Sequence, residues 1–346
     1  MTADKTQIAD ELKRWSLQQL GLPPEEPATL SVVSGDASFR CYYRLSLPGD
    51  MHFIAVHAPP EKEDNPAFIA VQQRMMAANL RVPGMLGWDL ERGFLLQEDF
   101  GDQLLLPCLD SIDAADRYYR EAFTCLLNMQ SMPLADGDLP DYDRARLLEE
   151  MALFPHWFVE QLLGHSLSDA EWQMLARLFD RLAARAEAQP QGFVHRDFHS
   201  RNIMLLNDGE LGLIDFQDAV RGPLTYDVMS LLRDCYVHWP PASVKTWLLA
   251  YRQQLVAAGI AVPDEDAFLW DADWMGLQRH IKVLGIFARL KLRDGKSAYL
   301  DDLPLVMAYT LSVAEQYEDC REFVTWFSDT LLPLARQQSW FREVIL

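Results

Sequence analysis

The sequence has few cysteines, and they form no recognisable pattern. The five cysteines are odd in number, scattered along 346 residues, and never arranged as C-x-x-C. Zinc sites and disulfide frameworks need closely spaced or paired cysteines. We therefore expect free thiols and a protein of the reducing cytoplasm.

Long apolar runs and an excess of basic residues are also missing. No apolar run approaches the ~18–20 residues that span a bilayer, so we expect no membrane partner. Lys and Arg number 31 against 51 Asp and Glu, which gives a formal net charge of −20. A protein that neutralises nucleic-acid phosphates needs a basic face, so this balance argues against a nucleic-acid partner. No segment indicates an obligate protein partner.

The sequence does contain enough hydrophobic residues for two lobes. They make up 49% of the chain, which allows a large core. Residues 29–57 alternate in the manner of strands, residues 66–79 carry apolar positions at helical spacing, and residues 85–97 contain two further strand-like runs. Residues 1–100 are therefore predicted to form an antiparallel sheet with one helix, preceded by a leading amphipathic helix.

Residues 101–346 are predicted to be mainly helical, with a few short strand-like runs between residues 193 and 214. The predicted fold class is therefore α+β, with a small antiparallel β-rich N-terminal lobe and a larger, mainly helical C-terminal lobe. Ligand clefts commonly form at the junction between two such lobes.

One segment that interrupts the helices carries the inventory of a phosphoryl-transfer site. His195-Arg196-Asp197 is followed by Asn202, and Asp215 stands at the end of an apolar strand. Phosphoryl transfer needs a carboxylate to accept a proton and oxygen ligands for magnesium on the nucleotide phosphates. The spacing H-x-D-x4-N, followed by Ile-Asp-Phe, is far more specific than H-x-D alone. The alternative is a chance set of Asp and Asn side chains that cap neighbouring elements.

Residues 193–234 resemble the aminoglycoside-phosphotransferase and choline-kinase branch of the protein-kinase-like fold, and the resemblance covers nearly the whole chain. It implies a bilobal fold in which residues 1–100 clamp the nucleotide. Residues 101–346 would carry the catalytic loop and the substrate site. The implied cofactors are ATP and Mg²⁺.

The same resemblance implies a role for each residue of the motif. Asp197 would be the catalytic base, and His195 would brace the catalytic loop. Asn202 and Asp215 would be the magnesium ligands. Asp218 is a candidate for an outer contact to the metal or the substrate. A further acid, Asp227, matches a position that ties its helix to the catalytic loop.

The nucleotide clamp departs from the family pattern. The segment between the first two strand-like runs offers one glycine where a glycine-rich loop is expected, and its phosphate-binding candidates are Ser34, Gly35 and Ser38. His57 stands where the third strand of kinases ends in lysine. His57 either contacts phosphate or simply ends the strand, and Lys62 is a possible substitute.

Asp99-Phe100-Gly101 spells the metal-binding motif of protein kinases, but it follows a strand well before the catalytic loop. We interpret this segment as the hinge that meets the adenine ring. Its candidate contacts are Gln97, Glu98 and Asp99.

Three segments resemble a narrower group, the anomeric sugar kinases of peptidoglycan recycling, which phosphorylate N-acetylmuramate and N-acetylglucosamine at the anomeric hydroxyl. They are residues 58–64, 214–234 and 273–306. A new helix follows Gly222-Pro223 where protein kinases have a long activation segment. The resemblance therefore implies a small-molecule amino sugar as substrate.

Residues 279–296 form a local basic island in an acidic chain, with six Lys and Arg residues and one acid. Arg279, His280 and Lys282 are candidates to meet the lactyl carboxylate of N-acetylmuramate. Exposed basic residues that balance neighbouring acids are an equally good explanation. Trp274 is a candidate to stack on a sugar ring, although tryptophan on an apolar helix face is more often core.

Two alternatives remain open from the sequence. An aminoglycoside phosphotransferase would bind polycationic substrates, with which the negative charge is compatible, although net charge does not locate a cleft. A pseudokinase that acts only as a binding module would explain why position 57 is histidine and not the expected lysine. The intact base and metal ligands argue against this second alternative.

Overall fold

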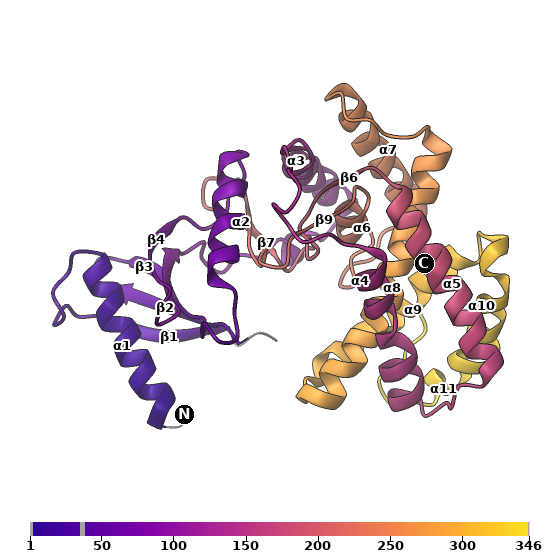
Figure 1. Cartoon of the computed structure of the whole chain (residues 1–346), viewed down its shortest axis with the longest axis horizontal. Helices are drawn as coiled ribbons and strands as arrows, with labels where there is room; N and C mark the ends of the chain where they lie inside the picture. The colour runs from indigo at the N-terminus through magenta and orange to yellow at the C-terminus, as the bar shows by residue number, and fades with distance from the viewer. Residues whose placement is uncertain (1–2, 35–38, 345) are drawn as a thin grey trace. The chain divides into compact units, whose positions relative to one another are not determined.

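The computed structural model describes residues 3–34, 39–344 and 346, which belong to two compact units (Figure 1). The first unit comprises residues Met1–Leu104 and Ile203–Gln217. The second comprises Leu105–Asn202 and Asp218–Leu346. The predicted fold class is confirmed, because the first unit is built on an antiparallel sheet and the second is mainly helical.

The first unit contains a five-stranded antiparallel sheet with the strand order β1-β2-β3-β5-β4. The predicted order of strands and helices in this part of the chain is confirmed. The elements are α1 (Ala3–Gln19), β1 (Thr29–Ser34), β2 (Cys41–Leu47), β3 (Met51–His57), α2 (Asn65–Ala77), β4 (Met85–Asp89), β5 (Phe94–Glu98), β7 (Ile203–Leu205) and β8 (Leu211–Leu213).

Side-chain alternation explains how this sheet is covered. Along β2, Tyr43, Leu45 and Leu47 are buried, while the residues between them are only partly buried, as the two-residue period of a strand requires. Leu12 and Trp15 of α1 belong to the same apolar cluster as Tyr43. The leading amphipathic helix therefore packs on one face of the sheet.

The β7–β8 hairpin belongs to the first unit, whereas a division at residue 100 would place it in the larger lobe. The N–H of Leu213 donates to the carbonyl oxygen of Arg81 at 2.8 Å. The ring of Phe216 stacks on Phe68 of α2 with 5.0 Å between the centroids. These contacts between segments far apart in sequence attach the hairpin and the residues after it to α2 and to the segment that follows α2.

The second unit contains the remaining elements, in which one two-stranded sheet pairs β6 with β9. No helix among the described residues is long and apolar enough to cross a membrane. The elements are η1 (Leu106–Cys108), α3 (Ile112–Gln130), α4 (Arg144–Met151), η2 (Phe154–Leu162), α5 (Asp169–Ala188), β6 (Gln191–Val194), β9 (Val220–Pro223), α6 (Tyr226–Leu232), α7 (Pro241–Ala257), α8 (Glu265–Asp294), η3 (Ser297–Asp302), α9 (Leu303–Ala314), η4 (Glu318–Cys320), α10 (Arg321–Trp326), η5 (Phe327–Leu331) and α11 (Leu332–Arg336).

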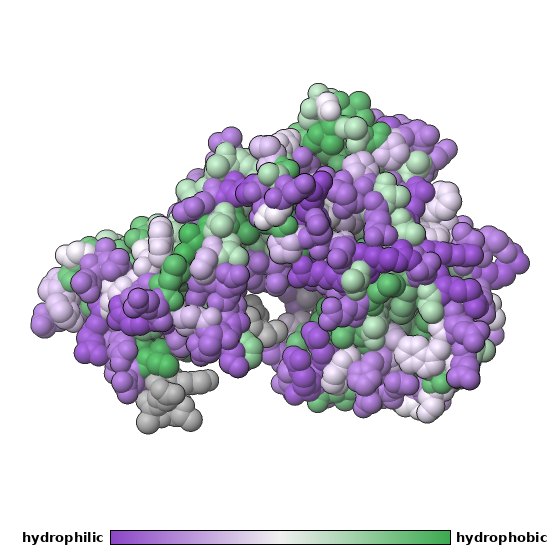
Figure 2. Space-filling model, in the orientation of Figure 1, coloured by the Kyte–Doolittle hydropathy of each residue, from purple (hydrophilic) through white to green (hydrophobic). Residues whose placement is uncertain are grey.

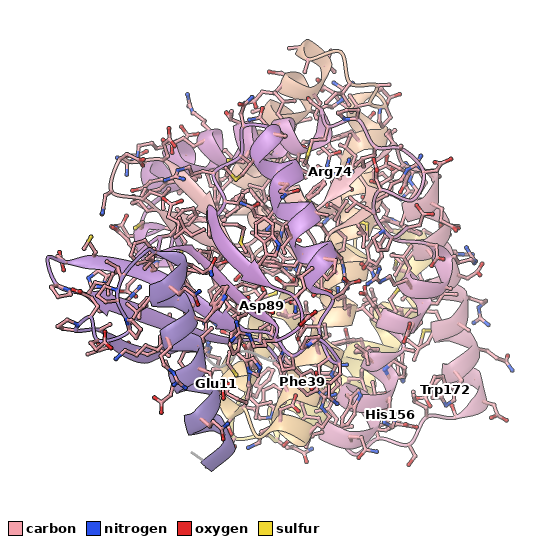
Figure 3. All side chains as sticks on the ribbon, turned by 60° about the vertical axis from the view of Figure 1, so that its left-hand side comes forward. Glu11, Phe39, Arg74, Asp89, His156 and Trp172 are labelled. Atoms are coloured by element: carbon pink, nitrogen blue, oxygen red, sulfur yellow. The ribbon has the colours of Figure 1, made fainter. Side chains whose placement is uncertain are left out.

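The long helix α8 is the centre of the second unit and packs against η2, α5, α6 and α9. Its residues Leu277, Ile281, Leu284 and Ala288 are all fully buried, which confirms that they face the core. Hydrophilic residues cover much of the face in view in Figure 2. Exposed aromatic residues such as Phe39 and Trp172, labelled in Figure 3, belong to different units.

A glycine allows α8 to approach the start of η2 closely. A Cβ atom at Gly285 would lie 2.4 Å from the carbonyl carbon of Leu153 and 2.6 Å from the backbone nitrogen of Phe154. Backbone atoms cannot yield as the end of a flexible side chain does. By contrast, a Cβ atom at Gly276 of the same helix would meet only side-chain atoms, at 3.4 Å.

We predict that Gly285→Ala lowers the free energy of unfolding by about 2 kcal/mol, because overpacking forces the backbone of η2 away from α8. The control Gly276→Ala should be neutral or stabilising, since alanine favours the helix by up to about 1 kcal/mol. Thermal denaturation followed by circular dichroism measures both. Equal melting temperatures for the two variants would contradict the close approach.

Candidate active site

The predicted catalytic loop runs from the end of β6 to Asn202, where the first segment of the second unit ends. The carbonyl oxygen of Asp197 accepts a hydrogen bond from the N–H of His199 at 3.0 Å and one from Nδ2 of Asn202 at 3.1 Å. The N–H of Asn202 donates in turn to the carbonyl oxygen of His199 at 2.9 Å. The loop is therefore a folded turn that places Asp197 and Asn202 in contact.

A fully buried carboxylate fixes the start of this loop. Asp227 of α6 accepts hydrogen bonds from the N–H groups of His195 and Arg196 at 2.6 and 3.0 Å. Burial raises the pKa of Asp227 to about 7, although these two donors favour the ionised form. The expected tie between this helix and the catalytic loop is confirmed.

A second buried carboxylate fixes the middle of the loop, and the sequence interpretation missed it. Asp234 accepts hydrogen bonds from the N–H of Ser200 at 2.9 Å and from its hydroxyl at 2.5 Å. Asp234 follows Asp227 by seven residues, which is two helical turns. That spacing, with a serine in the loop, is the signal that could have identified it.

Arg196 has a backbone φ of 74°, in the left-handed region that favours glycine. Its guanidinium forms an ion pair with the partly buried Glu150 of α4 and donates to the carbonyl oxygen of Asp218 at 3.4 Å. The guanidinium also lies 5.6 Å from the centre of the Tyr142 ring. These contacts offset the cost of the backbone conformation, which is about 1–3 kcal/mol for a non-glycine residue.

Glu150 also binds Lys282, one of the residues predicted to contact substrate. The Lys282 ammonium lies 3.1 Å from Glu150 and donates to the hydroxyl of Tyr226 at 3.1 Å. Burial opposes ionisation of Glu150, but the charges of Lys282 and Arg196 hold the pKa of its carboxyl below its ordinary value. Sequence reasoning missed Glu150 because its partners lie far away along the chain.

The electrostatics at Asp197 suit a proton acceptor. Burial would raise the pKa of Asp197, but the positive charge of Lys282 and other neighbours holds it below the ordinary value. The carboxylate is therefore ionised at neutral pH. His195, the predicted brace, is fully buried and lies against the ring of Phe198 with 6.0 Å between the centroids.

The other predicted substrate residues of α8 lie in different surroundings. His280 Nε2 is 3.0 Å from the carbonyl oxygen of Arg233, and burial followed by the charge of Arg279 lowers the pKa of His280 to about 3. Trp274 is buried among aromatic rings. Asp218, outside α8, is more than half exposed.

The predicted nucleotide residues belong to the first unit. Gln97 is buried in β5, the carboxylate of Glu98 pairs with Arg81 at 2.7 Å, and Asp99 pairs with Arg44 at 2.5 Å. These ion pairs commit both carboxylates, so an adenine contact in this segment would come from its backbone.

Two of the phosphate-binding candidates, Ser34 and His57, lie at the other end of this sheet. Ser34 ends β1 opposite Tyr42, while Gly35 and Ser38 lie outside the described residues. His57 ends β3, with its ring 5.8 Å from that of Phe94. The ammonium of Lys62 lies over the ring of Phe39 at 5.0 Å.

The sequence interpretation missed a buried ion pair whose residues are close in sequence to these candidates. Arg40 is 3% exposed and lies 3.1 Å from the carboxylate of Glu63. Its guanidinium also lies over the ring of Phe68 at 4.8 Å. The unit thus holds an Arg–Glu pair although it lacks the expected lysine.

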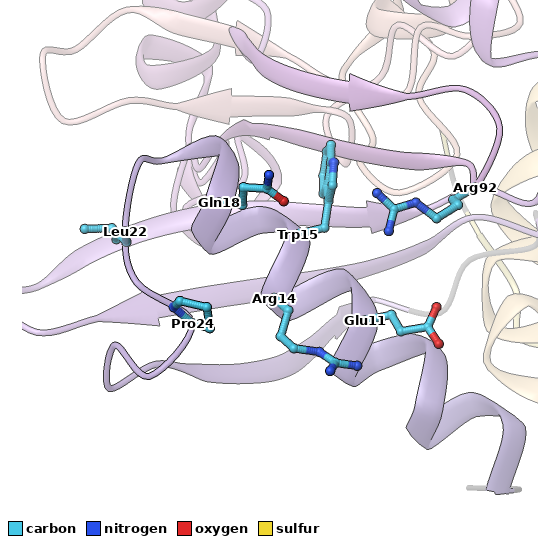
Figure 4. A pocket seen from close by; sticks show the side chains of 7 residues that line it. All are labelled: Glu11, Arg14, Trp15, Gln18, Leu22, Pro24 and Arg92. Atoms are coloured by element: carbon cyan, nitrogen blue, oxygen red, sulfur yellow. The ribbon is translucent and has the colours of Figure 1, made fainter.

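A pocket in the same unit lies beside α1 (Figure 4). None of the predicted site residues lines it, so it has no part in the site inferred from the sequence. The lining residues are Glu11, Arg14, Trp15, Gln18, Leu22, Pro24 and Arg92.

Comparison with known proteins identifies the family. Residues 29–268 match the phosphotransferase enzyme family. The chain belongs to this family. An N-acetylmuramate/N-acetylglucosamine kinase of Pseudomonas putida is 45% identical over 290 residues, which cover 82% of this chain and 84% of that protein. The protein of the same name from Pseudomonas aeruginosa is 42% identical over 284 residues, with coverages of 82% and 83%.

Solved structures show the same fold for this phosphotransferase. A choline kinase from Streptococcus pneumoniae superimposes with a TM-score of 0.61 at 12% identity, covering 88% of this chain and 99% of that one. The predicted resemblance to the aminoglycoside-phosphotransferase and choline-kinase branch is therefore confirmed.

The donor chemistry of the phosphotransferase fits magnesium bound to a nucleotide. No group of three or more His, Cys, Asp and Glu side chains in the described part of the chain is placed to hold a metal ion. Asp215, with a φ of 64°, and Asn202 each offer oxygen, the ligand that Mg²⁺ prefers. Magnesium in such enzymes takes one or two protein ligands and completes its shell with phosphates and water. The metal-binding roles of both residues stay predictions.

We predict that Asp227→Asn lowers the kcat of the phosphotransferase about 10- to 100-fold. The N–H groups of His195 and Arg196 bind different oxygens of Asp227, so in asparagine an NH2 group would replace one acceptor. An unpaired buried donor costs about 1–3 kcal/mol. ADP release measures kcat, and the KM for ATP should change much less, because Asp227 contacts the loop rather than the nucleotide. A variant with wild-type kcat and only a lower melting temperature would contradict a positioning role.

Proposed function

We propose that this phosphotransferase is an ATP-dependent kinase of the amino sugars N-acetylmuramate and N-acetylglucosamine that acts in the cytoplasm. The observation that carries the proposal is the anchored loop of Asp197, in a chain 45% and 42% identical to two proteins named as kinases of these sugars. The acceptor would be the anomeric hydroxyl, and the product a sugar 1-phosphate that serves peptidoglycan recycling.

Each residue of the loop has a part in the proposed reaction. Asp197 would accept the proton of the sugar hydroxyl as that oxygen attacks the γ-phosphorus of ATP. His195 would hold the loop from its buried position. Asn202 and Asp215 would bind Mg²⁺, which neutralises charge on the nucleotide phosphates when it is bound.

The short connection after Asp215 supports a small acceptor. Strand β9 begins at Val220 and α6 at Tyr226, so a long activation segment has no place between them. Protein kinases use such a segment to control their active site. An amino sugar needs no such platform.

The proposal is tested by incubating the protein with ATP, Mg²⁺ and each of N-acetylmuramate, N-acetylglucosamine and kanamycin. We expect ADP release with both sugars and loss of their reducing ends, because phosphorylation at C1 blocks the reducing aldehyde. Turnover of kanamycin with neither sugar consumed would overturn the proposal in favour of an aminoglycoside phosphotransferase. Nucleotide binding without turnover of any acceptor would favour a binding module.

We predict that Asp197→Asn lowers kcat at least ~100-fold, since general-base catalysis contributes about 10²- to 10⁴-fold. Nucleotide affinity, measured by calorimetry, should stay close to that of the wild type. The exposed Asp136 provides a matched control, because Asp136→Asn removes an acid of the same unit and should leave kcat unchanged. Wild-type turnover by the Asp197 variant would exclude Asp197 as the base.

A further inference from the structure

Three consecutive residues join the catalytic loop to helix α8. Asp234 binds Ser200, as described above. Cys235 accepts a hydrogen bond at its Sγ atom from Nη1 of Arg279, at 3.4 Å. The ring of Tyr236 meets that of His199 at 5.5 Å between centroids. This segment, residues 234–236, therefore brings Arg279 to the side of the loop that carries His199 and Ser200.

Arg279 is a buried cation with an unusual set of partners. Its residue surface is 4% exposed, and among the described residues no carboxylate lies within ion-pair distance of it. A buried charge is normally paired, because its desolvation is costly. The thiol of Cys235 is a weak acceptor and occupies one of five N–H groups.

The remaining donors of Arg279 have no hydrogen-bond partner among the described residues. Some polar side-chain atoms of the described chain are enclosed and have no hydrogen-bond partner, such as Nε of Arg196 and Nη1 of Arg233. No nitrogen atom of Arg279 is among them. The guanidinium thus has donors that keep some contact with solvent. Lys282 and His280, by contrast, bind Glu150 and the Arg233 carbonyl oxygen.

Further positive charge and hydrogen-bonding capacity stand beside this arginine. The guanidinium of Arg201 lies over the ring of Tyr236 at 3.6 Å. His199 Nδ1 is buried and has no hydrogen-bond partner in the described chain. A planar guanidinium binds a carboxylate through two parallel hydrogen bonds, so this cluster matches an organic carboxylate better than a neutral hydroxyl.

Resting on the proposed function, we infer that Arg279 binds the lactyl carboxylate of N-acetylmuramate and so determines how the enzyme discriminates between its two sugars. N-acetylglucosamine lacks this group. Removal of Arg279 therefore removes binding energy that only one substrate uses, whereas loss of folding or of Asp197 affects both sugars together. One assay with both sugars therefore separates an effect on specificity from an effect on the catalytic loop.

The test measures kcat/KM for both sugars in Arg279→Met. We expect the ratio of N-acetylmuramate to N-acetylglucosamine to fall about 10- to 100-fold, because hydrogen bonds to a charged group contribute about 1.5–3 kcal/mol. Arg279→Lys should restore part of the ratio by keeping the charge. The control Arg293→Met removes an exposed arginine of the same helix and should leave the ratio unchanged.

A substrate variant completes the design. The methyl ester of N-acetylmuramate has no carboxylate charge, so the wild type should use it less well than the acid, and Arg279→Met should treat the two alike. Equal losses for both sugars in Arg279→Met, or an unchanged ratio, would overturn the inference while the proposed function stands. Wild-type protein that turns over neither sugar would overturn both.

Discussion

The loop of residues 195–202, which carries the predicted base Asp197, depends on two buried carboxylates that hold its backbone in place. A loop has no neighbouring strand to pair its N–H groups, and apolar packing does not fix their direction. Asp227 takes the donors of His195 and Arg196, and Asp234 takes those of Ser200. Because both acids come from α6 or the residues just after it, this short buried helix sets the position of Asp197.

A third acid, Glu150, is paired with two cations, because burying its carboxylate without them would be costly. Glu150 draws Arg196 and Lys282 into one cluster, and that cluster keeps Arg196 in a left-handed backbone conformation directly before Asp197. The basic island at residues 279–296 is therefore not one surface. Lys282 stabilises the interior, whereas Arg293 is exposed and pairs with its neighbour Asp294.

Patterns among neighbouring residues predicted the helices and strands well. They could not predict side-chain contacts between residues far apart in the sequence. Alternation in β2 and helical spacing in α8 are properties of neighbouring residues, so the sequence suffices for them. The motif spacing likewise identified Asp197, Asn202 and Asp215 as candidates. Glu150 had no such signal, because its partners Arg196 and Lys282 are 46 and 132 residues away. Only the fold brings them together.

Under the proposed function, the enzyme would use two sugars that share the reacting hydroxyl and differ in one carboxylate. The hydroxyl that would react is common to both sugars, and the proposed base, Asp197, lies on the anchored loop. The carboxylate belongs to one sugar, and under our inference its recognition uses a cation that no protein acid holds in a direct ion pair. Among the described residues, Arg279 of α8 has no carboxylate within ion-pair distance, although the charges of the buried Asp234 and Asp227 act on it from farther away. Its field acts strongly because the surroundings are poorly solvated, and the net charge of −20 on distant surfaces is screened by salt. Specificity and catalysis can therefore vary independently.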